Sequence, residues 1–196
     1  MLRNPIHKRI EKFESWQNYT FMACLCERMY PNYYMFCQQT ELYDASVYRK
    51  ILDLVWESLV VKGAKVNFDS QLEKLEPAIP DANLFDFYGV YPAIDACVAL
   101  SELIHAHLSG ETLSHAISVS EISIGTVAMF EMTQEGREMT DEELKLLPAI
   151  QDELDVQWEI YRLLVDCEER DVELIKGLRS ELKEEKTSNL CIKIER

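Results

Sequence analysis

Glu102 and His105 are the residues whose types and spacing come nearest to a metal site. A Glu and a His three residues apart share one face of a helix, and four-helix di-iron proteins use this pair twice, with a glutamate from each of two further helices. Here the pair occurs once, and His7, His107 and His115 form no second copy. The helix dipole favours cations near a helix C-terminus. The pattern therefore favours solvated side chains, with a metal site at Glu102 and His105 as the alternative.

Asp95 is the one charged residue between Val90 and Leu100. A carboxylate buried without partners is strongly disfavoured, so Asp95 must be ion-paired, hydrogen-bonded, protonated or facing a cavity. A buried carboxylate is a candidate functional group, although a structural ion pair or a hydrogen bond to a tyrosine is commoner. Arg28 and Arg49 are the candidate partners for such a pair.

Tyrosine and tryptophan side chains are concentrated in the first third of the chain. Such side chains combine apolar area with a polar tip, which is common in interfaces and pocket walls. Ordinary core packing is the competing interpretation. The residues concerned are Trp16, Tyr19, Tyr30, Tyr33, Tyr34 and Trp56. We hypothesise that Tyr30 and Trp56 line a ligand pocket together with Asp95.

Other motifs that carry chemistry are missing from the sequence. It contains no Gly-x-Ser-x-Gly nucleophile elbow, no Gly-rich phosphate loop and no dinucleotide fingerprint. The six cysteines lack the spacing of a zinc knuckle or a redox motif. The sequence thus offers no specific reason to propose an enzyme, and it indicates no particular cofactor.

Charge and hydropathy limit the classes of partner. The formal net charge of −15 at pH 7 argues against nucleic acid, whose binding depends on neutralising phosphates. The longest uncharged apolar stretch, Tyr19 to Cys26, is far shorter than the ~20 residues of a membrane span. No signal-peptide pattern is found near the N-terminus. We expect a cytoplasmic protein with reduced thiols and without membrane or nucleic-acid partners.

The spacing of apolar residues predicts an all-α bundle of about seven or eight helices in a single domain over residues 1–186. Residues 112–135 contain a short alternation typical of a strand, but the whole span fits a helix better. Pro31 is expected to end the first long helix, because a proline interrupts the helical hydrogen bonds. The predicted helices cover about 5–29, 32–40, 47–61, 69–76, 92–108, 112–135, 141–147 and 149–184.

The last predicted helix, about 149–184, is unusually long. From Leu154 to Leu182 its residues recur at steps of four and three, as in a coiled coil, with two charges, Glu168 and Arg179, in the otherwise apolar seam. At 1.5 Å per residue it would span roughly 50 Å, more than a compact bundle of this size needs. We expect it either to break near Gly177 or to project toward a partner helix. Residues 187–196 are expected to be a frayed or added tail.

Several runs of the sequence resemble the YjaG-like family of bacterial proteins. The resemblance extends over essentially the whole chain and is carried by SWQNYTFMACLCERMYPNY (15–33), KVNFDSQLE (65–73), YGVYPAIDAC (88–97), MFEMTQEGREM (129–139) and CEERD (167–171). It implies a compact, all-helical cytosolic protein with a domain of unknown function, and it assigns no catalytic or binding residues.

Two hypotheses about function follow. The first is a non-enzymatic protein that contacts another protein or a second copy of itself, suggested by the heptad steps of 154–182 and by the aromatic cluster. The alternative is a small-ligand or metal-binding bundle with a pocket near Asp95 and Glu102.

Overall fold

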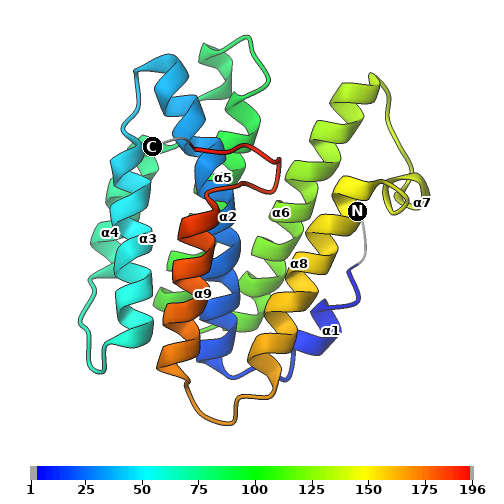
Figure 1. The fold of residues 1–196 in the computed structure, drawn as a ribbon. Helices are drawn as coiled ribbons and strands as arrows, with labels where there is room; N and C mark the ends of the chain where they lie inside the picture. The colour runs from blue at the N-terminus through cyan, green and yellow to red at the C-terminus, as the bar shows by residue number, and fades with distance from the viewer. Residues whose placement is uncertain (1–3, 195–196) are drawn as a thin grey trace.

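Helix α2 (Ser15–Thr40) runs through the middle of the bundle and contacts α3, α5, α6, α8 and α9 (Figure 1). Every side chain from Phe21 to Cys26 is fully buried, as expected of an apolar run without a charged face. The structure is a computed structural model and describes residues 4–194.

The all-α, single-domain prediction is confirmed, and the described residues contain no β-strand beyond one isolated bridge between Thr187 and Lys193. Besides α2, the helices are α1 (His7–Ile10), α3 (Ala45–Val60), α4 (Phe68–Leu75), α5 (Val90–Ser109), α6 (Thr112–Glu135), α7 (Asp141–Leu144), α8 (Pro148–Val165) and α9 (Val172–Glu185), with short 3-10 helices η1 (Glu76–Ala78) and η2 (Ala82–Leu84).

The predicted end of a helix at Pro31 is wrong, because α2 continues through this proline to Thr40. A proline inside a helix costs about 3 kcal/mol. Met29, Tyr33 and Phe36 are buried on both sides of Pro31, and their burial outweighs that local cost. The N-terminal end differs too, since α1 is one short helix and α2 begins only at Ser15, where Glu14 and Gln17 form a capping box.

The predicted long C-terminal helix is two antiparallel helices, α8 and α9, joined by residues 166–171 (Figure 1). The break falls before α9 and not near Gly177. The carboxylate of Asp171 accepts hydrogen bonds from the backbone N–H groups of Glu173 and Leu174 at 3.0 Å, so it caps a new helix start. Apolar positions of the heptad pattern, Val165 and Ile175 among them, pack into the shared core.

The predicted tail does not fray over its described part, residues 187–194. Ser188 and Asn189 are buried, and the segment crosses α2 (Figure 1). Asn189 accepts a hydrogen bond from Asn32 Nδ2 at 2.9 Å and donates one to the carbonyl of Ser123 at 3.1 Å. Residues 1–3 and 195–196 of the predicted domain and tail lie outside the described residues.

Helix α6 is confirmed as a helix over the span where a strand was the alternative. By length and composition it could cross a membrane, and 44% of its most apolar window is buried. It contacts α2, α5 and α8, and the core helix of a soluble bundle has the same composition. Near its C-terminal end, Ile124, Val127 and Ala128 form a second, smaller apolar cluster with Leu144 and Ile150.

Candidate functional site

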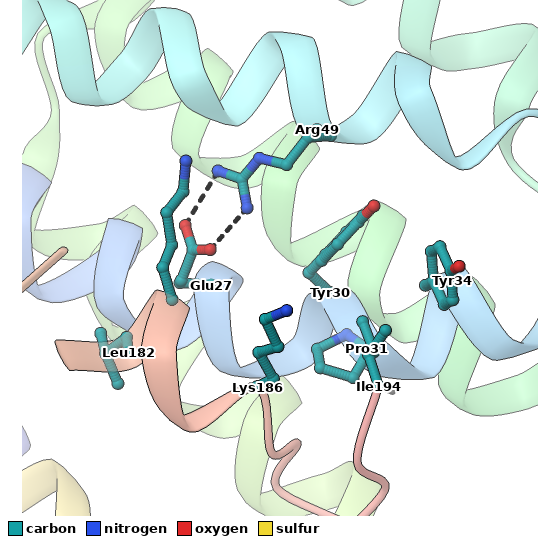
Figure 2. A pocket seen from close by; sticks show the side chains of 9 residues that line it. Glu27, Tyr30, Pro31, Tyr34, Arg49, Leu182, Lys186 and Ile194 are labelled. Atoms are coloured by element: carbon teal, nitrogen blue, oxygen red, sulfur yellow. Dashed lines mark hydrogen bonds and ion pairs between the residues drawn. The ribbon is translucent and has the colours of Figure 1, made fainter. Parts of the chain in front are cut away.

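A pocket of about 390 Å³ opens between α2, α3, α9 and the segment after α9 (Figure 2). Two tyrosines of α2 form part of its wall, so we call it the tyrosine pocket. Its lining residues are Glu27, Tyr30, Pro31, Tyr34, Arg49, Leu182, Lys183, Lys186 and Ile194.

A buried ion pair forms the inner wall of this pocket. Arg49 donates to both carboxylate oxygens of Glu27, with N–O distances of 2.5 and 2.9 Å. Trp56 Nε1 donates to the same carboxylate at 2.9 Å. The Glu27 side chain is 4% exposed and that of Arg49 is 19% exposed. Burying two charges is costly unless geometry and further hydrogen bonds compensate. The bidentate pair and its tryptophan donor supply such bonds, while the buried Nε of Arg49 has no hydrogen-bond partner among the described residues.

Asp53 extends this ion pair to α9. Its Oδ1 accepts hydrogen bonds from Arg49 Nη2 at 2.9 Å, Arg179 Nη2 at 2.6 Å and Lys183 Nζ at 2.8 Å. Burial alone would raise the pKa of Asp53, but the hydrogen bonds from Lys183 and Arg179 and the charge of Arg49 hold that pKa below its ordinary value. Asp53 therefore stays ionised and fastens α9 to α3.

The charge of the whole cluster is positive. Glu27 and Asp53 are its two carboxylates, and they face four cations, Arg49, Arg179, Lys183 and Lys186. Within residues 4–194, Lys186 alone of these four has no ion-pair partner within 4.0 Å. The cluster thus carries two net positive charges in a chain whose net charge is −15.

Lys186 presents its ammonium group to the interior of the pocket, and Tyr30 and Tyr34 line its wall. Figure 2 shows Lys186 between Glu27 and Tyr30, with its nitrogen directed into the pocket. The guanidinium of Arg49 lies 5.2 Å from the centre of the Tyr30 ring. Burial raises the pKa of Tyr30 to about 12, although Arg49 opposes the shift, so its hydroxyl is protonated at neutral pH. Among the described residues neither Tyr30 nor Tyr34 has a hydroxyl hydrogen bond to another residue.

Of the side chains predicted to share a ligand pocket, only Tyr30 lines this one. Trp56 is fully buried and supports the pocket through its hydrogen bond to Glu27. Asp95 lies at the contact of α5 and α6, where Thr126 Oγ1 donates to it at 2.8 Å. Burial raises the pKa of Asp95 against this hydrogen bond. A binding role for Asp95 stays a prediction, separate from the tyrosine pocket.

Neither arginine considered as a partner for Asp95 pairs with it. Arg28 forms an ion pair with the buried Glu153 of α8, and Arg49 pairs with Glu27 and Asp53. The expectation that Asp95 is held by one of these arginines is therefore wrong, because each is already engaged by a carboxylate.

Glu102 contacts His115 and not His105. Glu102 Oε2 lies 2.8 Å from His115 Nδ1, and His105 is exposed with its ring 6.3 Å from that of His115. Over residues 4–194, no group of three or more His, Cys, Asp or Glu side chains is arranged to hold a metal ion. The metal site at Glu102 and His105 stays a prediction.

Sequence reasoning missed four of the residues that build the pocket. Glu27 was detectable, since it and the adjacent Arg28 are the two charges inside an otherwise uncharged stretch of α2. Arg49 was considered only as a partner for Asp95. Lys183 and Lys186 look like ordinary surface lysines in the sequence, and only the reversal at residues 166–171 brings them to α2.

The comparisons with known proteins match nearly the whole length of the chain. Residues 5–193 match a family model described as "Protein of unknown function (DUF416)". "Uncharacterized protein YjaG" of Salmonella typhimurium is 72% identical over 192 residues, with 98% of each chain covered. The Escherichia coli protein of the same description is 71% identical, with the same coverage. A crystal structure of a DUF416 family protein from Shewanella baltica is 31% identical, covers 98% of this chain and 100% of its own, and superposes with a TM-score of 0.92.

Proposed function

The chain belongs to the DUF416 family, and we propose that it binds a small anionic ligand in the tyrosine pocket. The observation that carries the proposal is the local excess of two positive charges around Lys186 in a strongly acidic chain. A volume of about 390 Å³ falls within the range of roughly 300–1,000 Å³ common for small-molecule sites.

The lining of the pocket suggests the chemistry of the ligand. Lys186 and the hydroxyls of Tyr30 and Tyr34 are donors that suit a carboxylate or a phosphate. The tyrosine rings, with Pro31, Leu182 and Ile194, supply apolar area beside these donors. We therefore propose a ligand that combines an anionic group with a flat, apolar body, such as an aromatic carboxylate or phosphate.

The experiment is a calorimetric titration of the whole chain with phenyl phosphate and benzoate, and with neutral benzyl alcohol as the uncharged control. We expect the two anions to bind and the alcohol to bind at least about tenfold more weakly, a difference of about 1.4 kcal/mol. A ligand at about one hundred times its Kd stabilises the fold by about 2.7 kcal/mol, so the melting temperature should rise by roughly 5–10 °C.

Lys186→Asn tests the residue that carries the proposal. Lys186 has a left-handed backbone, with φ of 51°, a conformation that asparagine adopts more readily than most residues. The variant should keep its fold and lose at least about tenfold in affinity for phenyl phosphate. Lys176→Asn, at an exposed position of α9, is the matched control and should bind as the parent does. Failure of both anions to bind at millimolar concentration, or equal binding by Lys186→Asn, would overturn the proposal.

Other expectations about function also stay predictions. The hypothesis of a protein partner or self-association rested on the heptad steps of 154–182. Of those positions, Ile175 is buried, and Tyr161 and Val165 pack against the core of the bundle. A protein contact therefore needs another surface. A non-enzymatic role, a cytoplasmic location and the lack of nucleic-acid and membrane partners are supported by sequence composition alone.

A further inference from the structure

We infer that a methionine-lined groove at the α6–α7 end of the bundle docks a basic amphipathic helix of a partner protein. The inference concerns a different face from the tyrosine pocket, and the two sites have no lining residue in common. The groove, called here the methionine groove, has a volume of about 260 Å³ and is lined by Glu121, Ile124, Gly125, Ala128, Met129, Met132, Met139, Asp141 and Leu144.

The groove extends beyond this first hollow. A second, more open depression of about 520 Å³ shares Met129, Met132 and Met139 with it and continues toward Gly136 and Arg137. Two hollows joined along one methionine wall form an elongated site. Such a shape suits successive side chains of a helix, which recur along one face at steps of three and four residues.

The apolar wall of the groove is adaptable and open to solvent. Its floor belongs to the small cluster of Ile124, Ala128 and Leu144. Met129 is 53% exposed, and the half-buried Met132 and Met139 adjoin it in the same groove, so solvent meets a group of apolar side chains rather than a single one. Methionine is flexible and polarisable, and it is common on surfaces that accept apolar side chains from different partners.

Gly125 keeps the groove open. It lies inside α6, where glycine is less favourable than alanine by roughly 1 kcal/mol. A Cβ atom added at Gly125 would meet nothing within 4 Å, so the packing of this chain does not require a glycine here. Its absent side chain instead leaves room for close approach by another molecule.

The charge around the groove determines the kind of partner. Residues 121–145 contain seven acidic and two basic side chains, which gives this end a local charge of −5. An approaching helix with lysine or arginine beside its apolar stripe would be attracted and oriented. A second copy of this chain carries the same excess of acid and is disfavoured as the occupant.

The experiment measures the fluorescence anisotropy of a labelled synthetic helix that places leucine at positions i, i+3, i+4 and i+7 and lysine elsewhere. One matched peptide replaces the leucines with serine, and another replaces the lysines with glutamate. We expect the leucine–lysine peptide to bind at least about tenfold more tightly than either. Equal binding of the serine–lysine peptide would mean that charge alone attracts the peptide and would overturn the inference.

Gly125→Leu fills the groove without changing the charge. It should weaken binding of the leucine–lysine peptide by about tenfold or more. Gly177→Leu is the matched control, because Gly177 also lies in a helix and an added Cβ there also meets nothing within 4 Å. Met129→Gln, at a half-exposed position that should not disturb folding, provides a second variant with the same expected direction.

Two results would refute the groove as the docking site. One is unchanged peptide affinity in both Gly125→Leu and Met129→Gln, measured on protein whose circular dichroism melt matches the parent. The other is a parent dimer in sedimentation that Gly125→Leu dissociates, since this would assign the groove to a second copy of the chain.

Discussion

Removing the carboxylate of Glu27 should destabilise the protein far more than any surface change. In Glu27→Ala the buried guanidinium of Arg49 loses a bidentate partner and keeps only its single bond to Asp53. Trp56 Nε1 also loses its acceptor. Breaking a buried pair by removing one partner costs about 3–5 kcal/mol. The unmet indole N–H, about 1–3 kcal/mol by itself, overlaps with that cost because both groups share the same carboxylate.

The free energy of unfolding, measured by urea denaturation and followed by tryptophan fluorescence, tests this magnitude. A chain of this size loses about 2–4 °C of melting temperature per kcal/mol, so the variant should melt roughly 6–20 °C lower. Glu57→Ala, an exposed glutamate on α3, is the control and should change stability by less than about 0.5 kcal/mol.

A double variant identifies the cause of the loss. Glu27→Met combined with Arg49→Met removes both charges and leaves no unpaired ion, so it should cost less than Glu27→Ala alone. If Glu27→Ala lost less than about 1 kcal/mol with an unchanged urea dependence, the reasoning would be refuted, because Arg49 would then be satisfied by solvent or by Asp53.

Three further predictions concern single residues. His107 lies stacked between two aromatic rings, and burial lowers its pKa from 6.5 to about 4. Between these two pH values the unfolded state binds more protons than the folded state. The free energy of unfolding should therefore fall by about 3 kcal/mol as the pH drops from 6.5 to about 4. His107→Phe should remove this component in pH-dependent melts, and a parallel loss in both proteins would contradict it. Asp95→Asn should raise the melting temperature at neutral pH but not at acidic pH, because burial raises the pKa of Asp95 and so penalises its charged form; a lower melting temperature at neutral pH would argue that the carboxylate is ionised and paired. Gly177→Ala should stabilise α9 by roughly 0.5–1 kcal/mol, since its Cβ meets nothing within 4 Å, and a destabilised urea transition would count against the packing described.

Helix periodicity predicted most of the bundle, because side chains three and four residues apart lie on the same face of a helix. Residues 112–135 show this well, since their long-range spacing outweighed a short alternation typical of a strand. Pro31 shows the limit of local rules. The cost of an interior proline is local, whereas the burial that outweighs it comes from other elements: Tyr33 packs against Tyr48 of α3, and Phe36 packs against Phe85.

The break between α8 and α9 illustrates a second limit. The steps of three and four continue from Val165 through the charged Glu168 to Val172, so the period alone favours one helix. Two signals indicated a reversal of the chain: the polar run between Val165 and Val172, and the ability of Asp171 to cap a new helix. Tyr30 and Trp56 were identified from their types, but Lys183 and Lys186 join them only through that reversal.

The link between Asp53 and α9 has a consequence for the solution conditions. Arg179 and Lys183 reach Asp53 from 126 and 130 residues away in the sequence, and all three side chains are partly exposed. Dissolved ions screen such contacts increasingly as the Debye length shortens, from about 10 Å at 0.1 M to about 3 Å at 1 M. Ionic strength therefore acts twice at this place, weakening the attraction for an anion and loosening the helix that carries Lys183 and Leu182.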